Sequence, residues 1–217
     1  MATEPLHLTE ELYAYLVDHG SRPDPIVRDL IDETQSTMGS AAGMQIAPDQ
    51  AAFLTMLTQL LGVRHAVEVG TFTGLSSLSI ARGLAPGGTL ICCDVSEEYT
   101  SVARRYWERA AITDRVELRI GPAADTLAAM PAEPHIDLAF IDADKASYPT
   151  YWAEIVPRMR SGGVILVDNV LRHGRVLNPQ SEDDQVMVRF NDAVMDDDRV
   201  DAIMLPIADG LTLARKG

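Results

Sequence analysis

Two short apolar runs of the sequence end in residues that carry oxygen donors. The run at 136–141 is followed by Asp142, and the run at 164–167 is followed by Asp168 and Asn169. If these runs form neighbouring parallel strands, the three side chains lie at one edge of the sheet, with the strands roughly 5 Å apart. Two carboxylates and an amide carbonyl suit Mg²⁺, Mn²⁺ or Ca²⁺ better than Zn²⁺. The alternative is that each residue is an ordinary turn residue or helix cap.

A basic residue follows the first of these acids. Lys145 lies three residues beyond Asp142, in the sequence Asp142-Ala-Asp-Lys, and can project toward the same edge. Two carboxylates at close range repel each other, and a cation between them relieves that repulsion. A lysine beside such a cation is a candidate general base. The alternative for Lys145 is a solvated surface lysine.

A glycine turn follows an earlier apolar run at 66–69. Gly70 and Gly74 are separated by three residues, and a helix is expected to begin there, so that its first backbone N–H groups face a ligand. Asp94 ends the next run, 24 residues after Gly70, where an acid can accept hydrogen bonds from the two hydroxyls of a ribose. Together these features favour an adenosine-containing cofactor. A purely structural turn, with Asp94 as a helix cap, is the alternative.

Strands and helices must hold these residues in place. From residue 63 onward short apolar runs alternate with helical stretches, which predicts a parallel, doubly wound α/β sheet with helices on both faces. The first five strands are expected at 66–69, 89–93, 116–120, 136–141 and 164–167, and the helices between them at 74–84, 97–110, 123–130 and 147–159. Two further runs around Asp209-Gly210 predict an antiparallel hairpin after a helix at 184–196, with strands at 202–205 and 211–214.

The first 62 residues have a different, helical pattern. Helices are expected at 8–18, 24–38 and 48–61, the second capped by Asp24 and the third ended by Gly62. We therefore expect one domain, with residues 1–62 as a helical cap and residues 63–217 as the α/β core. The polar stretch at 178–185 is expected to be the most mobile loop.

Composition limits the class of partner. The 217 residues include 18 Lys and Arg against 32 Asp and Glu, a net charge of −14 that disfavours nucleic acid and anionic membranes as partners. Most acids, including Asp183-Asp184 and the run at 196–198, are interpreted as solvated surface. No apolar run approaches the roughly 20 residues that span a bilayer, and no secretory leader is recognised. The adjacent Cys92 and Cys93 would point to opposite faces of a strand, which indicates free thiols and a reducing, cytoplasmic location.

Taken jointly, the motifs resemble those of the cation-dependent O-methyltransferases of the catechol and caffeoyl-coenzyme A type, in particular the bacterial branch. The matching patterns are E-x-G-x-x-T-G from Glu68, an acid after the second strand, D-x-D-K from Asp142 and D-N-V from Asp168, and the likeness extends from Met44 to the C-terminus. The resemblance implies a Rossmann-like class I methyltransferase fold with a seven-stranded, mostly parallel sheet. It also implies a homodimer.

The resemblance assigns roles to individual residues. S-adenosylmethionine would bind along the first two strand ends, and the implied contacts are Met44, Gln45, Glu68, Gly70, Thr71, Ser76, Asp94, Ala123, Asp142 and Asp144. A divalent cation, most simply Mg²⁺, would be held by Asp142, Asp168 and Asn169. Lys145 matches the proposed base, and Lys145, Asn169 and His173 would face the methyl acceptor. The implied reaction is methylation of one oxygen of a vicinal diol, most simply a catechol.

The residues expected to contact the methyl acceptor are where this sequence differs from the family. His173 stands where plant members carry a substrate-contacting Asn, so it either contacts a different acceptor or is a solvated loop residue. No basic N-terminal site for coenzyme A phosphates is recognised, and the acidic charge argues against a coenzyme A ester. Two other functions remain open. One is a nicotinamide-dependent oxidoreductase, which shares the strand, glycine turn and acid, and the other is a non-catalytic cofactor-binding protein.

Overall fold

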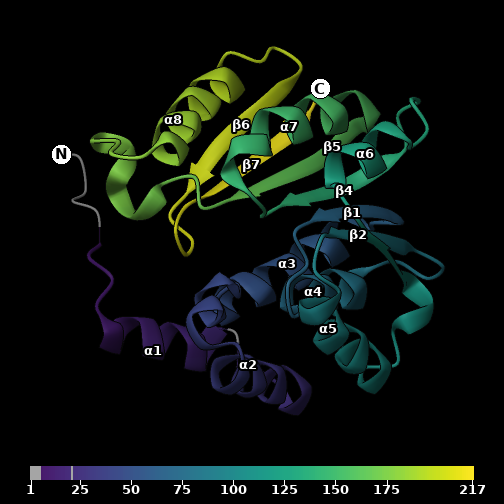
Figure 1. Ribbon diagram of the computed structural model, residues 1–217, viewed down its shortest axis with the longest axis vertical. Helices are drawn as coiled ribbons and strands as arrows, with labels where there is room; N and C mark the ends of the chain where they lie inside the picture. Colours follow the sequence, from purple (N-terminus) through teal and green to yellow (C-terminus); the bar gives the residue numbers. More distant parts are fainter. Residues whose placement is uncertain (1–5, 21) are drawn as a thin grey trace.

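A computed structural model describes residues 6–20 and 22–217. Its centre is a seven-stranded sheet with the order β3-β2-β1-β4-β5-β7-β6 (Figure 1). Strands β1 to β5 are parallel, and β7 runs antiparallel to both β5 and β6. The predicted doubly wound sheet with its antiparallel hairpin is confirmed. The strands are β1 His65–Val69, β2 Thr89–Asp94, β3 Val116–Ile120, β4 Ile136–Ile141, β5 Met159–Asp168, β6 Val200–Leu205 and β7 Leu211–Lys216.

Helices cover both faces of the sheet, with α3, α4 and α5 on one side and α6, α7 and α8 on the other (Figure 1). Each side has its own apolar core, built around Leu54, Leu78 and Trp107 on the first side and around Tyr148 and Phe190 on the second. The α-helices are α1 Glu10–Gly20, α2 Pro25–Thr37, α3 Pro48–Leu61, α4 Leu75–Gly83, α5 Glu97–Arg109, α6 Ala123–Ala128, α7 Tyr148–Ile155 and α8 Glu182–Met195. Short 3₁₀ helices are η1 Gly39–Met44, η2 Thr113–Arg115, η3 Lys145–Ser147, η4 Val156–Arg158 and η5 Arg172–Leu177. None of the helices in the described ranges combines the length and apolar character of a membrane span.

Local sequence signals set several helix ends as expected. The Asp24 carboxylate accepts hydrogen bonds from the first backbone N–H groups of α2, and Gly62 ends α3 in a left-handed conformation with φ of 60°. The expected helix at 8–18 begins instead at Glu10, behind Thr9, whose hydroxyl accepts from the Leu12 N–H at 3.2 Å. Cys92 and Cys93 are free and buried, as expected for neighbours in β2.

The ends of β1 and β4 touch at Gly70. This residue has φ of +90°, and a Cβ built on it would lie 1.9 Å from the carbonyl oxygen of Asp142. The Asp142 N–H donates to the Val69 carbonyl at 2.8 Å, and the Gly70 N–H donates to the Cys93 carbonyl at 2.9 Å. Glycine is therefore required to bring three strand ends together.

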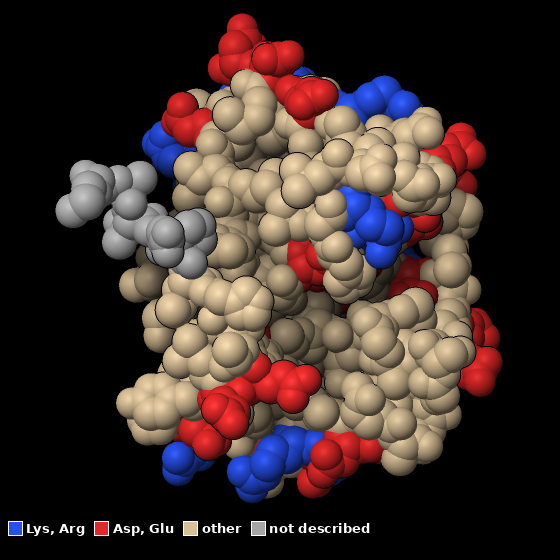
Figure 2. Space-filling view, turned by 90° about the vertical axis from the view of Figure 1, so that its left-hand side faces the viewer, with Lys and Arg blue, Asp and Glu red and all other residues tan. Residues whose placement is uncertain are grey.

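The carboxyl ends of the parallel strands open onto one side of the molecule. Figure 2 shows this side, which is hollowed near its middle, with acidic side chains at several points around the hollow. Because β1, β4 and β5 are adjacent, the residues that follow them are neighbours at this edge. The sequence motifs after these strands therefore belong to one site.

The polar segment 178–185 is not a loop throughout. The helix α8 begins at Glu182, and Ser181 and Asp184 cap it reciprocally. Asp184 is fully buried, and its carboxylate pairs with Arg172 at 3.2 Å and with Arg175 at 3.1 Å. The mobile-loop prediction is therefore wrong for 182–185, and so is the interpretation of Asp184 as a solvated acid. The sequence did contain a signal for this cap, which was missed: Ser181 and Asp184 form an S-x-x-D pattern ahead of a helical stretch.

Replacing Gly70 by alanine is expected to lower the free energy of unfolding by about 3 kcal/mol, because the added Cβ would overlap the Asp142 backbone. The matched control is Gly87→Ala. Gly87 has φ of +75° with no atom within 4 Å of the added Cβ, so this variant carries only left-handed strain, about 1 kcal/mol. Urea unfolding measures both changes. Equal losses in the two variants would contradict the close contact of β1 and β4.

Asp184→Ala is expected to lower Tm by several degrees, whereas Asp183→Ala, whose side chain is 52% exposed, is expected to change it little. Burial opposes ionisation of Asp184, but hydrogen bonds from Ser181, Arg175 and Arg172 outweigh it and lower the pKa of the carboxyl. The stabilisation is therefore present above the unfolded pKa of about 4 and is lost as the pH falls below it. Thermal unfolding of both variants from pH 7 to pH 3 measures this. A constant difference in Tm across that range would argue against the ion pairs.

Candidate active site

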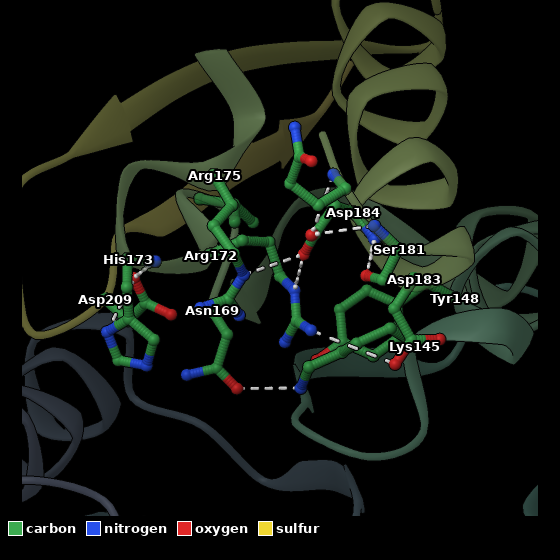
Figure 3. A network of polar contacts seen from close by, with 12 residues as sticks. Lys145, Tyr148, Asn169, Arg172, His173, Arg175, Ser181, Asp183, Asp184 and Asp209 are labelled. Carbon is green, nitrogen blue, oxygen red and sulfur yellow. Dashed lines mark hydrogen bonds and ion pairs between the residues drawn. The ribbon is translucent and has the colours of Figure 1, made fainter. Parts of the chain in front are cut away.

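The ammonium group of Lys145 contacts the residues of the strand-end cluster, and Figure 3 shows it facing the Asn169 side chain. Its Nζ donates to Asn169 Oδ1 at 2.7 Å, to the Ala143 carbonyl at 3.0 Å and to Asp142 Oδ1 at 3.3 Å. The Lys145 side chain is only 11% exposed, so it is not a solvated surface lysine. The structure thus brings together residues that follow β4 and β5, as the sequence predicts.

The carboxylates of Asp142 and Asp168 are both withdrawn from water. Asp168 is 2% exposed, and the side chain of Asp142 is 15% exposed. Burial raises the pKa of both groups, and the charge of Asp142 raises that of Asp168 further. Lys145 acts in the opposite direction on both carboxyls, and the Asn169 N–H donates to Asp168 Oδ1 at 2.7 Å. One ammonium group therefore faces two buried acids.

The donor chemistry of this cluster fits a hard divalent cation. Within the described part of the chain no group of three or more His, Cys, Asp or Glu side chains is placed to hold a metal. The expected set differs from such a group because its third donor is the amide oxygen of Asn169. Two buried carboxylates with raised pKa values and one amide oxygen match the preference of Mg²⁺ for oxygen donors. Asn169 adopts φ of 58°, a left-handed conformation that Asn tolerates well.

Tyr148 belongs to the cluster and was missed from the sequence. Its hydroxyl accepts from Lys145 Nζ at 2.6 Å and donates to the Asp168 carbonyl at 3.2 Å. The residue is fully buried at the start of α7, and its ring packs edge-on against Phe190. Its one sequence signal is its position three residues after Lys145. Tyr148 therefore joins the residues that follow β4 to the end of β5.

Polar atoms without partners mark the glycine-turn side of the site. Glu68 is fully buried, and neither of its carboxylate oxygens has a protein hydrogen-bond partner. Burial raises the pKa of Glu68 to about 7, and the nearby side chains of Ser76 and Thr71 oppose this shift. The Thr71 hydroxyl is also buried and without a partner. Unpaired buried groups are costly, which is consistent with a ligand that completes them.

Asp94 is hydrogen-bonded both to the glycine turn and to the residue before α5. One of its oxygens accepts from the N–H groups of Thr71 and Phe72 at 2.9 and 2.8 Å, and the other accepts from the Ser96 N–H at 2.8 Å. The N-cap of α5 is Ser96 and not Asp94. A carboxylate has about four acceptor positions, and three are used here. Asp94 therefore shapes the glycine turn and keeps capacity for a ribose hydroxyl, while the expected Thr71 backbone donor is already engaged.

The segment at 44–45 lies against the same turn. The Gln45 amide donates to the hydroxyls of Thr34 and Thr73 at 2.9 and 3.2 Å, and these two hydroxyls also bond each other. Met44 is 51% exposed beside it. Thr34 and Thr73, both buried, were not singled out from the sequence. They fix the helical N-terminal part to the residues that follow β1.

Two further expected cofactor residues lie on neighbouring elements. Ala123 begins α6, directly after a segment whose Gly121 N–H donates to the Asp94 carbonyl at 2.9 Å. Asp144 accepts a hydrogen bond from the Tyr151 hydroxyl at 2.6 Å. Ala123 is thereby placed next to the end of β2. The proposed roles of both residues in cofactor binding stay predictions.

His173 lies on a backbone turn beyond Asn169. It has φ of 51° and its side chain is 74% exposed, next to the Asp209 carboxylate (Figure 3). The Asp209 side chain accepts from the His173 N–H, and the Leu171 N–H donates to the Asp209 carbonyl at 3.0 Å. The turn at the β6–β7 hairpin therefore supports this loop. His173 is exposed on it, and its contact with an acceptor stays a prediction.

The sequence of this chain is similar to those of known proteins. A family model described as O-methyltransferase matches residues 17–217. A probable caffeoyl-CoA O-methyltransferase 1 of Dictyostelium discoideum is 38% identical over 208 residues, which is 93% of this chain and 90% of that protein. A catechol O-methyltransferase domain-containing protein 1 of Mus musculus is 33% identical over 94% of this chain and 79% of that protein.

Solved structures show the same likeness. The O-methyltransferase from Bacillus cereus in complex with SAH has a TM-score of 0.85 at 33% identity and covers 94% of this chain and 96% of that one. The O-methyltransferase TomG from Streptomyces achromogenes, in complex with SAM, has a TM-score of 0.86 at 26% identity and covers 95% and 96% of the two chains. The match of sheet, strand-end motifs and nearly the whole sequence leads to one conclusion, which is that this chain belongs to the O-methyltransferase family.

Proposed function

We propose that the protein transfers a methyl group from S-adenosylmethionine to one hydroxyl of a vicinal diol, most simply a catechol, with the help of a divalent cation. The observation that carries this proposal is the buried pair Asp142 and Asp168, which Lys145 faces next to the glycine turn. Membership of the O-methyltransferase family excludes the nicotinamide-dependent oxidoreductase as a reading of the same fold. The strand-end cluster argues against a protein that only binds the cofactor, because such a protein has no need of a lysine placed beside two buried acids.

The cofactor proposal rests on the unpaired groups beside the glycine turn. Glu68 and Thr71 present buried polar atoms without partners, and Ser76 lies in the first turn of α4. Asp94 keeps acceptor capacity for a ribose. The Bacillus cereus relative was solved with SAH and the Streptomyces achromogenes relative with SAM, which supports the same donor here.

The cation would be held by Asp142, Asp168 and Asn169. When bound, S-adenosylmethionine supplies an activated methyl group, and a divalent cation favours the ionised form of a neighbouring hydroxyl. Mg²⁺ is the simplest choice for this oxygen set, and Mn²⁺ or Ca²⁺ would suit the same donors. Lys145, in its neutral amine form, would accept the hydroxyl proton at Nζ and become the ammonium, and Tyr148 and Asn169 hold that atom in place through contacts of 2.6 and 2.7 Å. The protein's remaining contribution is to orient the acceptor oxygen toward the methyl group.

The choice of a free catechol as methyl acceptor rests on the net charge of the protein. The names of several relatives include caffeoyl-CoA, so a coenzyme A ester is the natural rival to a free catechol. Coenzyme A carries several phosphate charges, whereas this chain has a net charge of −14 and acidic side chains around the hollow in Figure 2. A neutral or cationic catechol fits that surface better. We also propose that the protein acts as a homodimer.

The test is an assay with labelled S-adenosylmethionine, Mg²⁺ and matched free and coenzyme A-linked catechols. We expect methylation of the free catechol, loss of activity with a chelator and recovery with added Mg²⁺. Asp168→Ala is expected to lower kcat/KM by at least 100-fold by removing a cation donor. Full activity of that variant, or of the chelated enzyme, would exclude the cation role. Preference for the coenzyme A ester would overturn the acceptor assignment.

Replacing Lys145 by methionine is expected to lower kcat by roughly 100-fold to 10,000-fold, because the proton acceptor is removed. The pH–rate curve is expected to move to higher pH, since the acceptor hydroxyl must then lose its proton to solvent. The other lysine of the chain, Lys216, lies at the end of β7, and Lys216→Met is the control that keeps the wild-type profile. Steady-state rates from pH 6 to pH 10 measure this. An unshifted profile in the Lys145 variant would rule out the base role.

A further inference from the structure

The segment that follows β5 has an unusual backbone. Asn169 adopts φ of 58°, and Arg172 and His173 each adopt φ of 51°. A left-handed backbone is costly for residues other than glycine, and it persists only where the surrounding structure holds it. Asn169 is also the third donor of the proposed cation site. The contacts that hold this segment therefore set the position of that donor.

Val170, the residue after this donor, is held through both of its backbone polar groups. Its N–H donates to the Gly210 carbonyl at 3.1 Å, a contact from the β6–β7 hairpin. Its carbonyl accepts from Asn191 Nδ2 at 2.9 Å, and Asn191 lies in α8. Val170 is 0% exposed, so water cannot easily replace either bond. Through Asn191, α8 therefore reaches the loop that carries Asn169.

The amide of Asn191 is committed to this contact. Its Oδ1 atom is buried and has no hydrogen-bond partner within the described part of the chain. An apolar side chain of the same shape would avoid the cost of that unpaired oxygen. The Nδ2 donor is therefore what an amide adds at this position, and its acceptor is the carbonyl of the residue next to Asn169.

The neighbour of Asn191 in α8 supports a second member of the strand-end cluster. Phe190 is buried, and its ring packs edge-on against Tyr148 with the ring centroids 5.7 Å apart. The Tyr148 hydroxyl and Asn169 Oδ1 both accept from Lys145 Nζ, at 2.6 and 2.7 Å. Close packing of Phe190 fixes the rotation of α8 and with it the direction of the Asn191 side chain. Two successive residues of α8 thus lie behind the two groups that hold Lys145 Nζ.

We propose that Asn191 is a positioning residue that, through the Val170 carbonyl, keeps the Asn169 amide oriented toward the proposed cation site. This inference rests on the proposed function and names a residue that the function alone does not require. Partners that orient a metal ligand typically change metal affinity by roughly 10-fold to 100-fold. Asn191 acts through the backbone of the loop, so its effect falls on the cation and not on S-adenosylmethionine.

Asn191→Leu tests this, because leucine keeps the approximate shape of the side chain and loses the donor. Mn²⁺ affinity, measured by electron paramagnetic resonance, is expected to fall about tenfold. The affinity for S-adenosylhomocysteine, measured by calorimetry, is expected to match that of the wild type, because the cofactor would bind beside the glycine turn. A parallel loss of both affinities would overturn the proposal.

A further measurement needs no cation. Hydrogen exchange at residues 168–174 of the metal-free protein, followed by mass spectrometry, is expected to be faster in Asn191→Leu than in the wild type. The reason is that the loop, whose Val170 and Leu171 N–H groups bond to the hairpin, loses its support from α8. Unchanged exchange in this segment would show that Asn191 does not hold it.

The matched control is Val194→Ala. Val194 is buried about one turn further along α8, so its truncation lowers overall stability without removing a hydrogen bond to the loop. This control is expected to keep wild-type Mn²⁺ affinity and wild-type exchange at 168–174. Asn191→Ala removes the same donor without adding bulk, and the same loss of Mn²⁺ affinity is expected from it if Asn191→Leu is poorly folded.

The outcomes separate the inference from the proposed function. Wild-type Mn²⁺ affinity in the Asn191 variants would overturn the positioning role and leave the proposed function standing. Equal losses in Asn191→Leu and Val194→Ala would also overturn it, because general destabilisation would then account for both. If the wild-type protein itself binds no Mn²⁺, the proposed cation site fails and the role of Asn191 fails with it.

Discussion

Two acids buried at the ends of adjacent strands are the constraint on which the rest of the site depends. Burial raises the cost of keeping Asp142 and Asp168 charged, and the charge of Asp142 adds to that cost for Asp168. The protein offsets this cost in part with the Lys145 ammonium group and the Asn169 N–H. A site arranged in this way favours positive charge nearby, and this is the basis of the proposed cation site.

The elements around the acids keep them in place. Gly70 lets β1 approach β4 closely enough to fix the backbone of Asp142, and the β6–β7 hairpin supports the residues after Asp168. The Val170 N–H donates to the Gly210 carbonyl at 3.1 Å, and a Cβ on Gly210 would lie 2.4 Å from Leu171. The hairpin therefore does more than close the sheet, since it holds the loop that carries the third donor.

The sequence predicted the parts of the site that short-range patterns control. Apolar runs mark where strands end, so the positions of Asp142, Asp168 and Asn169 followed from periodicity, and the glycine turn followed from spacing. Tyr148 and the partners of Asp184 could not be found in this way. They reach the site or their partners from elements whose packing is decided by the tertiary fold, and a buried Tyr has the same local pattern as a core residue.

Four buried acids divide by whether the fold supplies an arginine partner. Asp137 pairs with Arg160, and Asp184 pairs with Arg172 and Arg175, and the pKa values of both acids are lowered. Glu68 and Asp168 have no arginine partner, and their pKa values are raised. The first pair stabilises the fold, because each charge is already compensated. The second pair lies at the two proposed ligand positions, one beside the glycine turn and one beside Lys145, where the proposed sulfonium donor and metal ion would supply further compensation. The acidity of this chain is thus informative at four buried positions, where the presence or absence of an arginine separates the two acids that are paired within the fold from the two at the proposed ligand positions.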